Sequence, residues 1–61
     1  MTNQERRTAL LQRNVQMHSA LCTRYSAEVQ TWGFGPRADK LLYAIQERET
    51  AIKRMKEAWA L

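Results

Sequence analysis

The stretch Trp32-Gly33-Phe34-Gly35-Pro36 decides the fold of this chain. It contains both glycines and the only proline of the 61 residues, so the long segments on either side are free of helix breakers. Gly33 suits the left-handed residue that closes a helix, with Phe34 folding back on the last turn, and Pro36 suits the first position of a following helix. The stretch therefore predicts one short turn between two helices.

Both flanking segments have the hydrophobic spacing of amphipathic helices. The first has a seam, spaced alternately four and three residues apart, that consists of Leu11, Val15, His18, Cys22, Tyr25, Val29 and Trp32. The second repeats every seven residues at Ala38, Ile45, Ile52 and Trp59, with Leu41, Leu42 and Met55 beside them. This pattern is typical of helices packed lengthwise. We therefore expect one all-α domain over residues 1–61, a helical hairpin with helices at about 3–32 and 36–60 and a turn at 33–35. Thr2 and Glu5 have the spacing of a capping box at the start of the first helix.

Length and cysteine content limit how such a hairpin is stabilised. A chain of this size buries only about 60% of the surface that its unfolded form exposes, so a lone domain is marginal. The single Cys22 excludes an intrachain disulfide, and one histidine leaves too few soft ligands for a zinc site, so we expect no metal and no cofactor. Association with another chain is the remaining route. The unpaired cysteine and the absence of a signal-peptide pattern or of a membrane-spanning apolar run predict a cytoplasmic protein.

Apolar residues outside the seam indicate a surface for another chain. Leu10, Met17 and Leu21 widen the apolar arc of the first helix to about 160°, which is more than one partner helix covers. A row of small residues, Ala44, Ala51 and Ala58, lies beside the second seam and permits close helix approach. We expect a homodimer, a four-helix bundle, although the same surface could bind a different protein. The candidate dimer or partner interface consists of Leu10, Met17, Leu21, Tyr43 and Met55.

The charges gather at the open end of the hairpin. That end carries six basic residues, against the acidic Glu5 and Glu57: Arg6, Arg7, Arg13, Lys53, Arg54 and Lys56. The turn half is balanced, so this excess equals the whole formal net charge of +4. A basic end can attract nucleic acid or an acidic protein surface. It is also explained by an ordinary solvated face in which Glu49 pairs with Lys53.

The sequence offers little for catalysis. His18 and Cys22 stand four apart on one helix face, and two copies around a two-fold axis could bind zinc. A packed histidine and a buried cysteine explain the pair better, because both occupy seam positions. No third residue orients the histidine as a Cys-His nucleophile would need, and no glycine-rich phosphate loop follows a strand. We therefore expect no enzyme.

Two families of small helical hairpins provide resemblances. The opening Met1-Thr2-Asn3-Gln4-Glu5 with Thr8-Ala9-Leu10 resembles the start of the Rop family of plasmid copy-number proteins, hairpin dimers that bind paired RNA loops. The likeness covers about ten residues, and the glycine-rich turn and aromatic seam depart from that family. Size, basicity and the two-helix plan also resemble the small anti-activator proteins of Mu-like phages, hairpin dimers that bind and disable host proteins such as quorum-sensing regulators. That similarity is one of architecture only, and it transfers no residue.

These observations favour a protein–protein interaction module. The resemblance to anti-activators implies a phage or mobile-element inhibitor that blocks a host protein such as a transcriptional regulator, with Arg and Lys steering an acidic partner. The alternative is a Rop-like RNA- or DNA-binding four-helix-bundle dimer that uses the basic end. A structural subunit of a larger helical assembly is the third possibility. One hairpin can serve all of these functions, so the fold alone does not choose among them.

Overall fold

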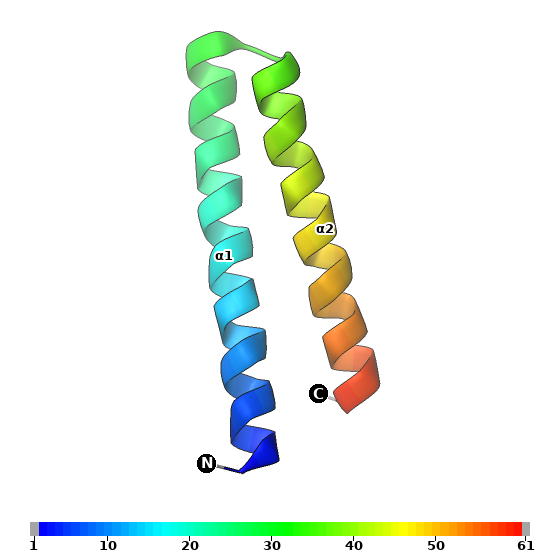
Figure 1. The fold of residues 1–61 in the computed structure, drawn as a ribbon. Helices are drawn as coiled ribbons and strands as arrows, with labels where there is room; N and C mark the ends of the chain where they lie inside the picture. The colour runs from blue at the N-terminus through cyan, green and yellow to red at the C-terminus, as the bar shows by residue number, and fades with distance from the viewer. Residues whose placement is uncertain (1, 61) are drawn as a thin grey trace.

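A computed structural model describes residues 2–60 as two long antiparallel helices joined by a short turn. Helix α1 is Asn3–Trp32 and helix α2 is Pro36–Trp59, and they lie side by side along their length (Figure 1). The all-α helical hairpin predicted from the sequence is confirmed. Within the described residues, no helix is apolar over a stretch long enough to cross a membrane.

The helix ends follow from local residue chemistry. Thr2 Oγ1 accepts a hydrogen bond of 3.1 Å from the backbone N–H of Glu5, and this satisfies a free donor of the first turn of α1. Gly33 has φ +73° and donates its N–H to the carbonyl of Val29 at 2.8 Å, which closes the last turn. Pro36 then begins α2. Phe34 is 81% exposed, so the expected packing of this ring on the last turn of α1 is wrong.

The contact between the helices buries few side chains. Among the described residues, only Ala38, Ile45 and Asn14 are buried. Val15 is 45% exposed and Trp32 is 63% exposed, although both were expected in the seam. The buried or half-buried side of α1 consists of five residues of the expected seam together with three others: Leu11, His18, Cys22, Tyr25 and Val29, with Asn14, Leu21 and Glu28. The contact with α2 is therefore rotated from the expected seam toward Asn14, Leu21 and Glu28.

The hairpin exposes more surface than a compact protein of its mass. Its accessible surface is 4957 Å², against about 4,100 Å² expected for a folded monomer of this size. Its radius of gyration is 14.0 Å, against about 10.5 Å for a compact chain of this length. Two helices form a single layer, whereas stable domains bury apolar surface between two layers. The excess surface therefore marks a layer that a second protein could supply.

Candidate interaction surface

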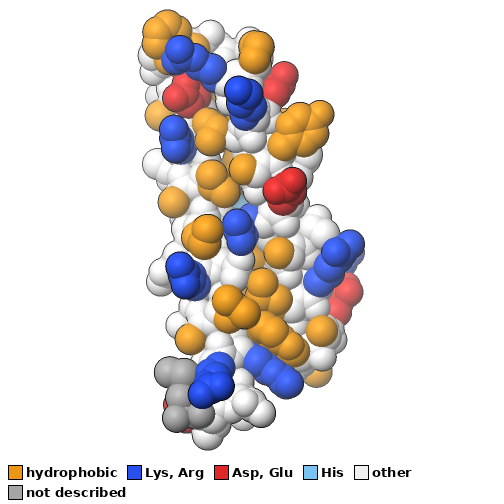
Figure 2. Space-filling view, viewed as in Figure 1, with side chains coloured by type: hydrophobic (Ala, Val, Ile, Leu, Met, Phe, Trp, Pro, Cys, Tyr) orange, Lys and Arg blue, Asp and Glu red, His pale blue; other side chains and the backbone are white. Residues whose placement is uncertain are grey.

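One broad face of the hairpin carries the uncovered apolar surface. Its centre is a shallow groove between the helices, which is lined by Met17, Ala20, Leu21, Arg24, Ala44 and Arg48. Leu10 extends it toward the open end, because Leu10 lies seven residues before Met17 on the same side of α1. We call these seven residues the flank face. Figure 2 shows hydrophobic side chains along the middle of this face and basic side chains on both sides.

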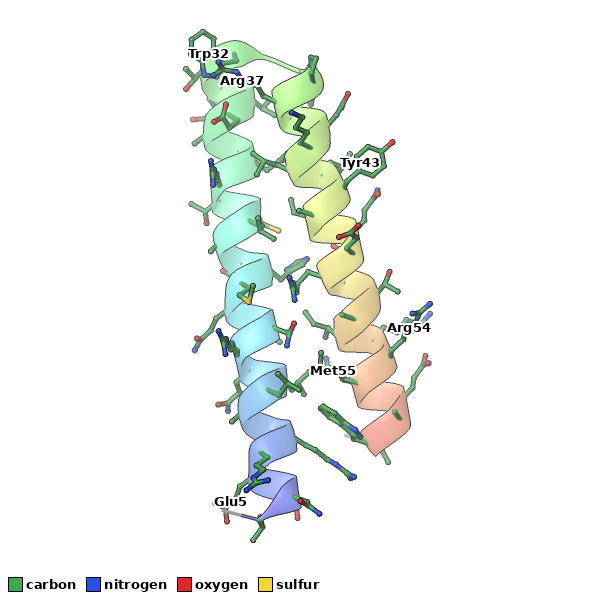
Figure 3. All side chains as sticks on the ribbon, viewed as in Figure 1. Glu5, Trp32, Arg37, Tyr43, Arg54 and Met55 are labelled. Carbon is green, nitrogen blue, oxygen red and sulfur yellow. The ribbon has the colours of Figure 1, made fainter. Side chains whose placement is uncertain are left out.

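The structure brings together three of the five expected interface residues. Leu10 and Met17 are 46% and 40% exposed, and Leu21 is half-buried beside them. Met55 lies between the helices and is half-buried, so it contributes mainly to the contact within the hairpin (Figure 3). Tyr43 points away from α1 and is 69% exposed. Tyr43 lines a separate depression on the outer side of α2 and is not part of the flank face.

A polar contact that sequence analysis missed crosses the hairpin at this face. Arg48 donates a hydrogen bond of 2.6 Å from Nη1 to Oδ1 of Asn14. Asn14 is only 5% exposed and donates from Nδ2 to the carbonyl of Leu10 at 2.8 Å. The Nε atom of Arg48 is buried and has no hydrogen-bond partner within residues 2–60. The sequence contains both polar residues at positions that face the other helix. A search for a purely apolar seam does not select them.

Within residues 2–60 the basic side chains have no carboxylate partners. None of the ten Lys and Arg residues forms an ion pair with an Asp or Glu in the described part of the chain. Arg24 belongs to the flank face, and Arg6 and Arg13 border it, because each lies three or four residues from an apolar member of that face. Their charge is therefore available to an acidic partner.

The six residues of the expected basic end do not form a single patch. Lys53 and Lys56 line a groove on the opposite face of the hairpin. Arg54 points outward from α2 (Figure 3), and the guanidinium of Arg7 lies 5.7 Å from the centroid of the Trp59 ring. Apart from Arg7, whose guanidinium lies over the Trp59 ring, only Arg6 and Arg13 of the six lie three or four residues from an apolar member of the flank face. The structure thus distributes this charge around the open end.

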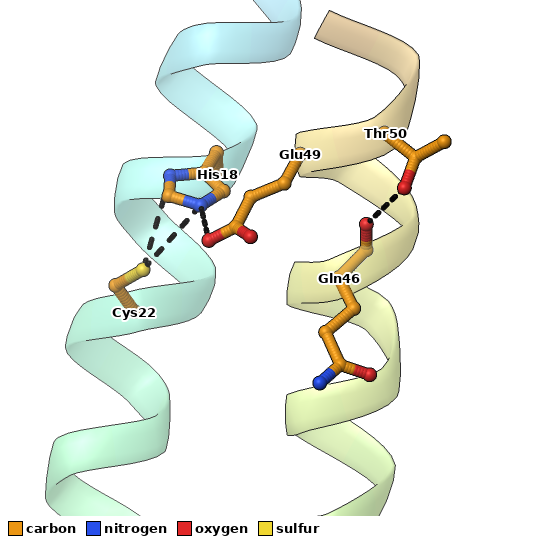
Figure 4. A network of polar contacts seen from close by, with 5 residues as sticks. All are labelled: His18, Cys22, Gln46, Glu49 and Thr50. Atoms are coloured by element: carbon orange, nitrogen blue, oxygen red, sulfur yellow. Dashed lines mark hydrogen bonds and ion pairs between the residues drawn. The ribbon is translucent and has the colours of Figure 1, made fainter. Parts of the chain in front are cut away.

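His18 lies at the opposite face and forms, with Glu49, the only contact within salt-bridge distance among the described residues. Its Nε2 is 3.0 Å from Oε1 of Glu49, and its Nδ1 is 3.8 Å from Sγ of Cys22 (Figure 4). Glu49 therefore pairs with His18 across the hairpin, and no Glu49–Lys53 ion pair forms. Among residues 2–60, no group of three or more His, Cys, Asp and Glu side chains is arranged to hold a metal ion. His18 and Glu49 act as a bridge between the helices.

The turn end carries exposed aromatic rings. Arg37 places its guanidinium 4.5 Å from the centroid of the Trp32 ring, at the tip of the hairpin (Figure 3). Such a cation–π contact is favourable even where it is exposed to solvent. The Trp32 ring thus contacts Arg37 of α2 while it remains outside the core.

The sequence matches no known family model, and no curated protein or solved structure is significantly similar to it.

Proposed function

We propose that this protein is a non-enzymatic protein–protein interaction module that acts through the flank face. The observation that carries the proposal is the uncovered apolar row of Leu10, Met17 and Leu21 on a hairpin that buries only two apolar side chains of its described residues. Apolar residues three, four and seven apart along a helix are the usual anchors of helix-in-groove docking. A further helix laid along the groove would complete the missing layer.

The size of the surface fits one side of an ordinary protein interface. The hairpin measures 44 by 18 Å in its two longest directions, so its broad face covers about 790 Å², close to the roughly 800 Å² that each partner contributes to a standard interface. The excess accessible surface of the hairpin, about 850 Å², has a similar size. Both quantities support a single partner that covers the whole face.

A second copy of the chain is the partner that we propose for the isolated protein. Two hairpins placed flank face to flank face would form a homodimeric four-helix bundle. The small side chains of Ala20 and Ala44 permit close approach of the second layer. This dimer would be the resting form, and a target protein would compete for the same face.

We propose that the protein blocks a host protein when that target displaces the second copy from the flank face. The resemblance to phage anti-activators motivates this role, and a chain of this size can inhibit simply by covering a surface that a regulator needs. A transcriptional regulator in the cytoplasm is the proposed class of target. The free charge of the Arg and Lys side chains would steer association with an acidic regulator surface.

One observation supports a nucleic-acid target as the alternative. All ten Lys and Arg residues lack a carboxylate partner within residues 2–60, and phosphate groups could neutralise them. The distribution of Lys53, Arg54 and Lys56 over two other surfaces argues against one continuous phosphate-binding track. We therefore place this function second.

Site-specific photo-crosslinking tests the proposed function. In one variant the photoreactive residue benzoylphenylalanine replaces Leu10 on the flank face. In the control variant it replaces Gln12, which is exposed on a different side of α1. In nuclease-treated lysate of the source cells, we expect crosslinked protein bands of defined mass from position 10 and none from position 12. Equal crosslinking at the two positions, or none at either, would contradict a role for the flank face.

A further inference from the structure

We propose that the flank face recognises an acidic amphipathic helix, whose central carboxylate pairs with Arg48. This inference rests on the proposed function and names the chemistry of the partner. Arg48 lines the apolar groove together with Leu21 and Ala44. A partner that covers Met17 and Leu21 must therefore also cover the guanidinium.

The position of the guanidinium is fixed before any partner binds. Asn14 holds Nη1 at 2.6 Å, and Asn14 is itself held by the backbone carbonyl of Leu10. Because Nε is buried, the N–H groups left for an outside acceptor are the second one of Nη1 and the two of Nη2. A guanidinium held in one orientation presents a fork that matches a carboxylate, so less side-chain entropy is lost when the pair forms.

The chain has no carboxylate of its own for this guanidinium within its described residues. Glu49 follows Arg48 in the sequence, but it points to the opposite face and contacts His18 at 3.0 Å. The Nε atom of Arg48 is buried without a hydrogen-bond partner in the same part of the chain. Covering a charged group with apolar surface is costly unless a partner of opposite charge is provided. The occupant of the groove must therefore bring an acidic side chain.

The residues on the flank face and its borders are mainly basic, like Arg48 itself. Arg7 is left out of this set because its guanidinium lies over the Trp59 ring. Helical spacing from the apolar residues then places six basic side chains on this face and its borders: Arg6, Arg13, Arg24, Arg37, Lys40 and Arg48. By the same spacing only Glu28 and Glu47 are acidic there. Figure 2 shows more basic side chains (blue) than acidic ones (red) around the hydrophobic side chains (orange). Acidic residues on the flanks of a bound helix would face these basic side chains.

The charge also makes a second copy the weaker occupant. Two flank faces packed on each other would bring twelve basic groups against four acidic groups, twice the number on one face, and each Arg48 would have to be covered by another basic face. Like charges across an interface cost free energy and suppress the wrong partner. An acidic helix avoids this cost and retains the apolar contacts. A helix of about 20 residues is roughly 30 Å long, so it fits along the 44 Å hairpin.

Three synthetic helical peptides and the full-length protein test the inference. The first peptide, of 21 residues, has Leu at positions three and four apart, Glu on both flanks and one Glu at the centre of the Leu row. The second differs only by Gln at that central position, and the third has Lys in place of every Glu. Binding is measured by fluorescence anisotropy at physiological salt, and light scattering on the same samples reports whether the chain is monomeric or dimeric.

We expect the Glu peptide to bind about tenfold more tightly than the central Gln peptide, as one charge-assisted pair provides. The Lys peptide should not bind. Arg48→Gln should abolish the difference between the Glu and Gln peptides, and Arg48→Lys should restore part of it. Lys53→Gln removes the same charge from the opposite face and should leave the difference unchanged. Circular dichroism verifies that each variant is helical.

Several results would overturn the inference. Equal binding of the Glu and Gln peptides, a difference that persists in Arg48→Gln, or no binding of the Glu peptide would each do so. A dimer that saturating Glu peptide does not dissociate would assign the face to a second copy, and displacement of the peptide by a short RNA duplex at physiological salt would assign it to nucleic acid. If the Lys peptide binds and Met17→Glu abolishes that binding, the proposed interaction function stands while the acidic partner is rejected.

Discussion

Arg48 and Asn14 form the only direct side-chain hydrogen bond between the helices that involves a buried residue of the described chain, with Nη1 of Arg48 2.6 Å from Oδ1 of Asn14. A buried polar contact of this kind fixes register, because sliding one helix along the other would leave Oδ1 of Asn14 without its donor. Apolar packing between two such helices is less selective, since Ala38 and Ile45 are the only buried apolar side chains within residues 2–60. The same contact positions Arg48 in the flank face.

A double-mutant cycle measures the value of this contact. We expect Asn14→Ala to lower the free energy of unfolding by about 1–3 kcal/mol, because a half-buried guanidinium then loses its acceptor. Arg48→Met should cost less or be neutral, since an apolar side chain of similar length needs no partner. The two effects should be non-additive in urea titrations followed by circular dichroism. Additive effects would show that the two residues do not interact in solution.

The two glycines of the turn provide a matched pair of substitutions. Gly33 has φ +73°, which side chains rarely adopt, whereas Gly35 has an extended φ of 169° that any residue adopts. A Cβ added at either position would meet no atom within 4 Å beyond its immediate chain neighbours, so space is equal at both. We expect Gly33→Ala to destabilise the hairpin by about 1–2 kcal/mol and Gly35→Ala to change stability little. Thermal melts of both variants check this, and equal destabilisation would contradict the assigned role of Gly33.

The two tryptophans should differ in their effect on stability. Trp59 is half-buried beneath the guanidinium of Arg7, whereas Trp32 is 63% exposed. Full burial of such a ring makes its removal cost about 3–5 kcal/mol, so we expect Trp59→Ala to cost about half of that and Trp32→Ala to cost less than about 1 kcal/mol. Urea titrations distinguish the two variants. A larger loss from Trp32→Ala would restore Trp32 to the structural role that the sequence predicted for it.

The sequence predicted the helices and the turn because those depend on local chemistry. Glycine, proline and the Thr2 cap act within a few residues of themselves, so their effects can be derived without knowing what lies opposite. The side of α1 that faces α2 depends on nonlocal contacts. An apolar criterion selected Val15, whereas the structure places polar Asn14 inside because Arg48 on the other helix provides its partner. Leu10, Met17 and Leu21 were recognisable in the sequence as apolar residues outside the seam. The position of Arg48 in the groove beside them can be recognised only from the fold.

Association should be visible as a dependence of melting on protein concentration. We expect the midpoint temperature to rise with concentration, because a dimer covers the flank face of each copy. Added salt should raise it further, since salt screens the repulsion between two basic faces. Met17→Glu should abolish both effects, while Gln12→Glu on another side of α1 should preserve them. A midpoint that is independent of concentration, together with a mass of about 7 kDa by light scattering, would reject the dimer.

The response to salt and to charge removal separates a protein target from a nucleic-acid target. A protein that neutralises several phosphates of a duplex loses affinity by roughly 0.9 log units per log unit of salt for each phosphate, and every basic residue that contacts the duplex contributes similarly. A protein target depends instead on buried anchors, and charges at its rim chiefly change the association rate. We therefore expect Leu21→Ala to weaken target binding far more than Lys56→Ala, and equilibrium affinity to fall only modestly between low and physiological salt. The decisive variant reverses the charge of Arg6, Arg7 and Arg13 and is tested against DNA, RNA and the crosslinked protein target. Tight nucleic-acid binding at physiological salt that this variant abolishes, with protein binding absent in the wild type, would replace the protein-interaction function with a nucleic-acid one.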